Sequence, residues 1–200
     1  MLNKFKNIYN SVEEQAKSTY SSTMENILGI YGNSIFLGTH VSGKTTLITW
    51  LSSKQLIKEY QPTEIEINSK KLYDISGSED KVKDWENYIK NKDNIFYLFD
   101  LYKFLNKSIY DDSNLNIKYD DLVLNHISFI TEHLSKKIKY KKLIVVGTHI
   151  DMLTSKQEAQ DIVKYIRNQI DCGKAIFING SLVNEENATK LKESLDKALK

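Results

Sequence analysis

Gly38-Thr39-His40-Val41-Ser42-Gly43-Lys44-Thr45 is the stretch that decides the interpretation of this 200-residue chain. It fits the pattern G-x-x-x-x-G-K-[ST] at every fixed position, and this composition produces such a match by chance in roughly 0.6% of sequences. The apolar segment 34–37 before it predicts a buried strand, and residues 46–58 after it predict a helix. A strand, a glycine-bounded loop and a helix in this order indicate a phosphate-binding loop.

Each part of this loop has a physical role in holding phosphate. The glycines let the backbone curl until its N–H groups face an anion, and the start of the following helix adds positive potential. Lys44 supplies a mobile positive charge, and the Thr45 hydroxyl can hold Mg²⁺. An ordinary strand, turn and helix without a ligand is the alternative. The expected contacts are Gly38, His40, Val41, Ser42, Gly43, Lys44, Thr45 and Thr46.

The composition narrows the class of protein. Hydrophobic residues make up 40% of the chain and charged residues 27%, so one domain with a real core is expected. The net charge of +2 gives no broad basic field for binding nucleic acid. The single cysteine, Cys172, excludes an internal disulfide. No segment has the ~20 apolar residues of a membrane span, so a cytoplasmic location is expected.

Alternating strands and helices predict an α/β fold: a three-layer sandwich whose mainly parallel, six-stranded sheet has helices on both faces. Residues 1–32 read as an amphipathic helical extension, expected to contact its own domain or a partner, not a membrane, and residues 33–200 as the main domain. The polar segment 106–118 is expected to be a surface loop, and His126 and His133 to lie at a surface or interface. The expected strands are 34–37, 64–67, 71–75, 95–100, 143–146 and 175–178, and the expected helices are 46–58, 82–90, 119–137, 157–170 and 185–199.

Three further motifs follow in order. They are Pro62-Thr63, Asp74-Ile75-Ser76-Gly77 and Thr148-His149-Ile150-Asp151. With the phosphate loop they make residues 34–199 resemble the Ras-like small GTPases, in the branch of ADP-ribosylation factors, G-protein α subunits and Roc domains. The resemblance implies a P-loop G domain that binds GTP or GDP with Mg²⁺.

The resemblance also assigns roles to single residues. It implies that Thr45, Thr63 and Asp74 serve Mg²⁺ and that the Gly77 amide meets the γ-phosphate. Thr148, His149 and Asp151 would read the base, and Ser181 and Leu182 stand where a last backbone contact to guanine is expected.

The chemistry of Asp151 supports a guanine preference. Its two carboxylate oxygens can accept hydrogen bonds from guanine N1–H and the 2-amino group, and adenine offers neither donor there. The alternative is that Asp151 only caps the next helix.

The expected catalytic set is Lys44, Thr63, Gly77 and Ser78. Ser78 occupies the place of the glutamine that orients water in Ras-like proteins, and the single arginine, Arg167, lies far along the chain. Slow intrinsic GTP hydrolysis is therefore expected, with any acceleration supplied by a partner.

The sequence thus predicts a GTP-binding molecular switch and weak GTPase that signals through an effector or activating protein. A non-hydrolysing, GTP-bound scaffold is the alternative. A P-loop kinase or ATPase is disfavoured because the chain lacks an arginine-rich lid. The oligomeric state stays open.

Overall fold

The computed structural model describes residues 31–56, 72–74, 82, 84–90, 92–112, 115–134 and 142–200. Within them the chain is α/β and contains a five-stranded sheet in the order β2-β1-β3-β6-β7. Every neighbouring pair in this sheet is parallel. The strands are β1 (Ser34–Gly38), β2 (Leu72–Asp74), β3 (Asn94–Asp100), β6 (Lys142–Thr148) and β7 (Ile176–Asn179).

These five strands confirm five of the six expected ones, while the expected strand 64–67 and the extension 1–30 lie outside the described residues. The other described elements are helices on the two faces of the sheet, a short 3-10 helix at Ile150–Met152 and one small antiparallel pair. The helices are α2 (Lys44–Ser53), α4 (Trp85–Ile89), α5 (Leu101–Leu105), α6 (Tyr119–Ser128), α8 (Lys156–Gln169) and α9 (Glu185–Leu199).

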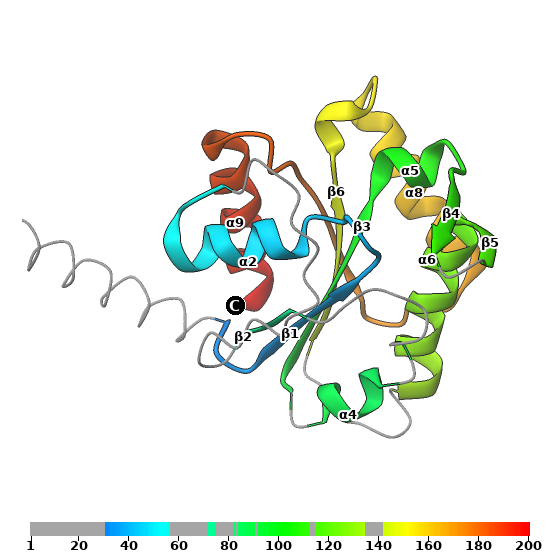
Figure 1. Cartoon of the computed structure of the whole chain (residues 1–200), viewed down its shortest axis with the longest axis horizontal. Coiled ribbons are helices and arrows are strands. Elements are labelled where there is room, and N and C mark those ends of the chain that lie inside the picture. Colours follow the sequence, from blue (N-terminus) through cyan, green and yellow to red (C-terminus); the bar gives the residue numbers. More distant parts are fainter. Residues whose placement is uncertain are drawn as a thin grey trace, which may run out of the picture.

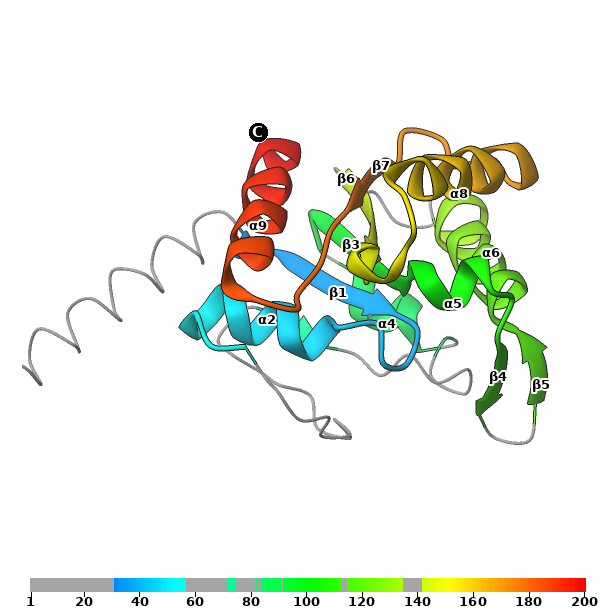
Figure 2. The same ribbon diagram turned by 90° about the horizontal axis from the view of Figure 1, so that it is seen from above.

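Helices α2 and α9 cover one face of the sheet, and α4, α5, α6 and α8 cover the other (Figures 1 and 2). Helix α2 ends earlier than expected because Lys54 adopts a left-handed conformation and its N–H bonds to the Trp50 carbonyl. Helix α6 continues as a π-helical segment, Phe129–Leu134. No helix in the described ranges combines the length and apolar character that crossing a membrane requires.

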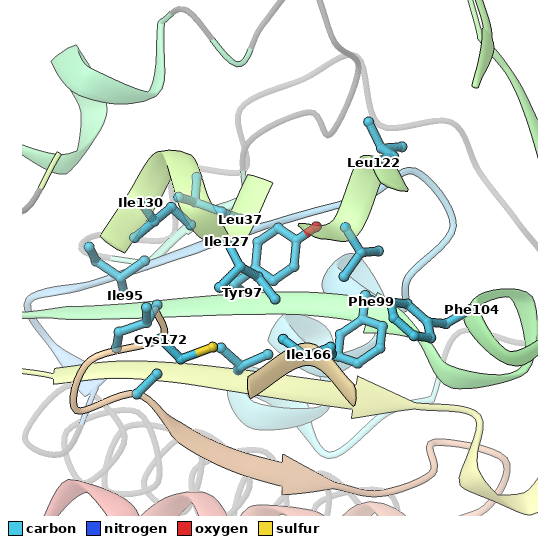
Figure 3. Close-up of a cluster of buried hydrophobic side chains, with 14 of the residues drawn as sticks. Leu37, Ile95, Tyr97, Phe99, Phe104, Leu122, Ile127, Ile130, Ile166 and Cys172 are labelled. Atoms are coloured by element: carbon cyan, nitrogen blue, oxygen red, sulfur yellow. The ribbon is translucent and has the colours of Figure 1, made fainter. Parts of the chain in front are cut away.

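The alternation of side chains along each strand divides the core in two. Phe36 and Phe96 face α2 and α9, and their rings stack with centroids 4.6 Å apart. Tyr97 and Phe99 point to the opposite face, where they meet α6, α8 and the buried Cys172 (Figure 3). Both faces of a parallel sheet are covered in this way, which explains why its strands are nearly continuous apolar runs.

The segment 106–118 corrects an expectation. It is not a surface loop, because β4 (Ile109–Asp112) and β5 (Leu115–Lys118) form an antiparallel two-stranded sheet. The second strand, Leu-Asn-Ile-Lys, alternates apolar and polar residues as a half-exposed strand does. The many Asp, Asn and Ser residues around it obscured that short alternation.

His126 is a second correction, because it lies in the core and not at a surface. Its side chain is 3% exposed, its Nδ1 is 3.0 Å from the Tyr97 hydroxyl, and its ring meets Trp85 edge-on at 4.9 Å. Burial, followed by the positive charge of Lys44, lowers the pKa of His126 to about 3. The imidazole is therefore neutral at physiological pH.

This buried imidazole predicts a pH-dependent stability. The unfolded chain binds a proton on His126 near pH 6.5, whereas the folded chain resists it down to about pH 3. The neutral His126 therefore does not lower the free energy of unfolding above about pH 6.5. Below that pH the unfolded chain gains a proton that the folded chain cannot bind, so the free energy of unfolding falls until about pH 3. The free energy of unfolding of the wild type should fall more steeply than that of His126→Gln, by ~1.4 kcal/mol per pH unit. Urea titrations across the window test this, and parallel slopes would contradict it.

Candidate functional site

The candidate site lies at the carboxyl edge of the sheet. Strands β1, β3 and β6 are parallel, so Gly38, Asp100 and Thr148 end at the same edge. After β1 the chain enters α2 on one face, and after β3 it enters α5 on the other (Figure 2). Such a point, where connections leave to opposite faces, is where open α/β sheets form a ligand crevice.

The loop between β1 and α2 has a backbone that depends on glycine. Gly38 has a φ of 139°, and a Cβ added there would lie 2.0 Å from the carbonyl oxygen of Leu98. The Thr39 N–H donates to that same oxygen at 3.2 Å, which ties the loop to β3. Further along, Val41 and Gly43 have positive φ values of 58° and 82° on either side of Ser42. Alternation of this kind turns successive N–H groups toward one concave side, which suits an anion.

Lys44 bends back over this loop. Its Nζ donates to the carbonyl oxygens of Gly38 at 3.2 Å and Thr39 at 2.7 Å, and the residue is only 8% exposed. The Ser42 hydroxyl also donates to the Thr39 carbonyl, at 2.7 Å. The ammonium group is thus held at the mouth of the loop, and Thr45 follows it in the first turn of α2.

Two distant segments meet this loop. The Thr148 Oγ1 lies 3.1 Å from the Ser42 carbonyl oxygen and 3.0 Å from that of Phe99, so one hydroxyl joins the loop, β3 and β6. A Cβ at Gly43 would be 3.1 Å from Leu182 Cδ1, which places Leu182 directly against the loop. The sequence-predicted segments 38–45, 148–151 and 181–182 therefore lie together at this edge of the sheet.

The turn after β6 presents two of the expected base-reading residues. His149 adopts a left-handed conformation with a φ of 57°, and its Nδ1 lies 3.3 Å from the Asp100 carboxylate and 3.0 Å from Thr148 Oγ1. The next segment is secured to the β7 end because the Ile150 N–H donates to the Gly180 carbonyl at 3.3 Å. Ser181 is buried and its Oγ accepts from the Val183 N–H at 3.1 Å.

Asp151 does not cap the following helix. Ser155 caps α8, with its side chain accepting from the Glu158 N–H. Asp151 is exposed, and its carboxylate has no hydrogen bond or ion pair to the rest of the described chain. The helix-cap alternative is thus wrong, and the carboxylate is accessible to a ligand.

Other predicted site residues are only partly covered. Thr63, Gly77 and Ser78 lie outside the described residues, as does the side chain of Asp74, whose backbone pairs with Phe36 at the end of β2. His40 and Val41 are exposed at the loop tip, and Thr46 is half-buried in α2. In the part of the chain that is described, no three His, Cys, Asp or Glu side chains gather as a metal site would need.

Two residues of this site were not anticipated. The Tyr119 hydroxyl lies 2.5 Å from Thr39 Oγ1 and accepts from the Asp100 N–H at 2.8 Å. Asp100 also accepts from the Lys103 N–H at 3.0 Å, which starts α5. An aspartate ending a buried parallel strand is a usable sequence signal. No sequence signal points to Tyr119, because the position of its hydroxyl depends on how the β4–β5 pair brings the chain back beside the loop 38–45.

Comparison with known proteins identifies no family: no family model matches the sequence, and no curated protein matches it.

The close approach of Gly38 to β3 generates a prediction. Gly38→Ala should lower the free energy of unfolding by at least ~3 kcal/mol, because the methyl group meets backbone and the φ is strained. Gly173→Ala is the matched control, since Gly173 has a φ of 51° but nothing within 4 Å, and should cost only about 1 kcal/mol. Urea unfolding compares the two, and similar costs would show that the β1–β3 contact relaxes freely.

Proposed function

We propose that this chain is a GTP-binding molecular switch of the Ras-like type with slow intrinsic hydrolysis. The observation that carries the proposal is the meeting of three separated motifs around Gly43, where Thr148 bonds the loop and Leu182 packs on it. Parallel pairing alone brings the strand ends to one edge of the sheet. The contacts of Thr148 and Leu182 with the loop are more specific than that, and they support one shared ligand.

The phosphate groups would lie on the loop 38–45. Its alternating φ signs and the adjacent start of α2 supply N–H groups and positive potential, and Lys44 adds its ammonium charge. Gly38 permits this backbone path, because a Cβ there would collide with the backbone of Leu98. These features fit a nucleotide phosphate. In the proposal Thr45, Thr63 and Asp74 would hold Mg²⁺, which would supply charge neutralisation to the phosphate groups.

The base would be read at the turn after β6. Asp151 offers an exposed carboxylate that matches the paired donors of guanine. The Nδ1 of His149 lies 3.3 Å from the carboxylate of Asp100, which orients the imidazole ring. Ser181 and Leu182 complete this side of the site, with Leu182 against Gly43.

Slow hydrolysis is supported by the position of Arg167. Its guanidinium donates to the Ala175 carbonyl at 3.0 Å and stacks over Phe177 with a 4.6 Å separation from the ring centroid. These contacts hold it where β7 begins, at the edge of the sheet opposite the loop. The single arginine of the chain therefore cannot stabilise charge on a transferring phosphate from within the same molecule. A partner protein would supply that acceleration and read the segments around Thr63 and Gly77.

The first experiment identifies the nucleotide and its turnover. The protein, purified with Mg²⁺, should retain GDP or GTP and should hydrolyse GTP slowly and ATP not at all in single-turnover assays. Lys44→Ala should abolish retention because the loop loses its charge at the phosphates. Bound GTP without any turnover would favour the non-hydrolysing scaffold, and a preference for ATP would overturn the assignment of Asp151.

A second experiment tests the base-reading role directly. Asp151→Asn should lower the affinity for GTP at least tenfold and raise the affinity for xanthosine triphosphate. The C2 carbonyl of xanthine accepts a hydrogen bond from the new amide N–H, and its N1–H donates to the amide oxygen. The exposed Asp121→Asn, on α6, is the matched control and should leave both affinities unchanged. Equal loss of both nucleotides in Asp151→Asn would mean that the residue acts on the fold and not on the base.

A further inference from the structure

A separate pocket of about 400 Å³ lies among α5, α6 and α8, on the face of the sheet opposite α2. The nucleotide site proposed above does not use it. Its volume is in the range of small-molecule sites, at the lower end. The residues that line it include Phe104, Leu105, Asp120, Asp161, Ile162 and Tyr165.

Asp120 gives this pocket its chemistry. The residue is 4% exposed, and its Oδ1 is buried without a hydrogen-bond partner. A buried carboxylate normally has a cation or several N–H donors beside it, because transferring a charged group from water into the protein interior costs free energy. Asp120 is the second residue of α6, so the helix dipole offsets part of that cost. The dipole alone leaves Oδ1 without the hydrogen bond that a buried oxygen needs.

The neighbouring charges do not neutralise Asp120. Glu158 and Asp161 add two more acids to the pocket wall. Glu158 accepts from Thr154, which lowers the pKa of its carboxyl group, and Asp161 accepts from Gln157. Lys107 is the one cation among the lining residues, and it forms no ion pair with Asp120. The described pocket wall thus has an unbalanced negative charge.

The rest of the wall is apolar and aromatic. The rings of Phe104 and Tyr165 meet nearly edge-on, with centroids 6.1 Å apart, and Ile162 adjoins them. Tyr165 is 40% exposed and Leu105 42%, so both reach solvent at the rim. Aromatic faces attract cations and also cover an apolar body. This combination selects for a ligand that is positively charged at one end and apolar at the other.

We propose that this pocket binds an organic cation, an ammonium or guanidinium group on an apolar body, with Asp120 as its counter-ion. The cation lies on the Asp120 side of the pocket, where it offsets the charge of that buried carboxylate, and the body of the ligand lies against Phe104, Ile162 and Tyr165. A free amine and a basic side chain of a peptide share this chemistry. The proposal is independent of nucleotide binding.

The test follows the amide spectrum of the full chain by NMR during titration with phenethylamine. Saturable shifts should appear at Phe104, Ile162 and Tyr165, with the neutral analogue 2-phenylethanol binding at least tenfold more weakly. The blocked peptide acetyl-Leu-Arg-Leu-amide forms a second arm. Whichever probe binds more tightly identifies the source, a small amine or a peptide side chain.

Two variants make the outcome decisive. Asp120→Asn keeps the shape of the side chain and should weaken phenethylamine binding at least tenfold, while the neighbouring Asp121→Asn should not change it. Leu105→Lys, at an exposed rim position, places a tethered cation at the pocket and should also block the probe. Unchanged affinity in Asp120→Asn would overturn the role of Asp120 as counter-ion. Unchanged affinity in Leu105→Lys, or the absence of saturable shifts with either probe at ~10 mM, would overturn binding in this pocket.

Discussion

The site depends on the distance between two backbones at the end of β1. Gly38 runs so close to the Leu98 carbonyl that no side chain fits, and the Thr39 N–H then bonds that oxygen. This contact sets the direction in which the chain leaves the sheet. The turn that follows brings Lys44 back onto the carbonyls of Gly38 and Thr39 and starts α2 over the first face of the core. Backbone geometry therefore positions the charged group before any ligand is considered.

The second constraint is a set of hydrogen bonds that link the ends of neighbouring strands. One hydroxyl, that of Thr148, reaches the carbonyls of both Ser42 and Phe99, and the carboxylate of Asp100 orients His149. Each of these groups stands at the carboxyl end of a parallel strand, where chain direction brings them together. The same direction places Arg167, beside the start of β7, at the opposite edge. Parallel pairing therefore separates the proposed nucleotide site from the chain's single arginine.

Much of this arrangement follows from sequence patterns, and the exceptions have physical causes. Long apolar runs such as Asn94–Asp100 predict their strands, because a strand covered on both faces has no polar side to confuse the pattern. The loop 38–45 follows from the local spacing of its glycines, lysine and threonine. The β4–β5 pair was missed because its apolar positions alternate over only a few residues among polar ones. His126 and Asp120 could not be placed, since a polar residue's burial depends on helix packing that local periodicity does not encode.

Tyr119 joins the β4–β5 pair to the loop 38–45. Its single oxygen contacts both Thr39 and the Asp100 amide, and it follows β5 directly at the start of α6. Residues added between the two strands of the β4–β5 pair would leave that oxygen where it is. One residue added between Tyr119 and Asp121 would instead turn the ring by about 100° around the axis of α6, relative to the rest of that helix. The turn between β4 and β5 can therefore change in length without moving this oxygen, whereas the first turn of α6 cannot.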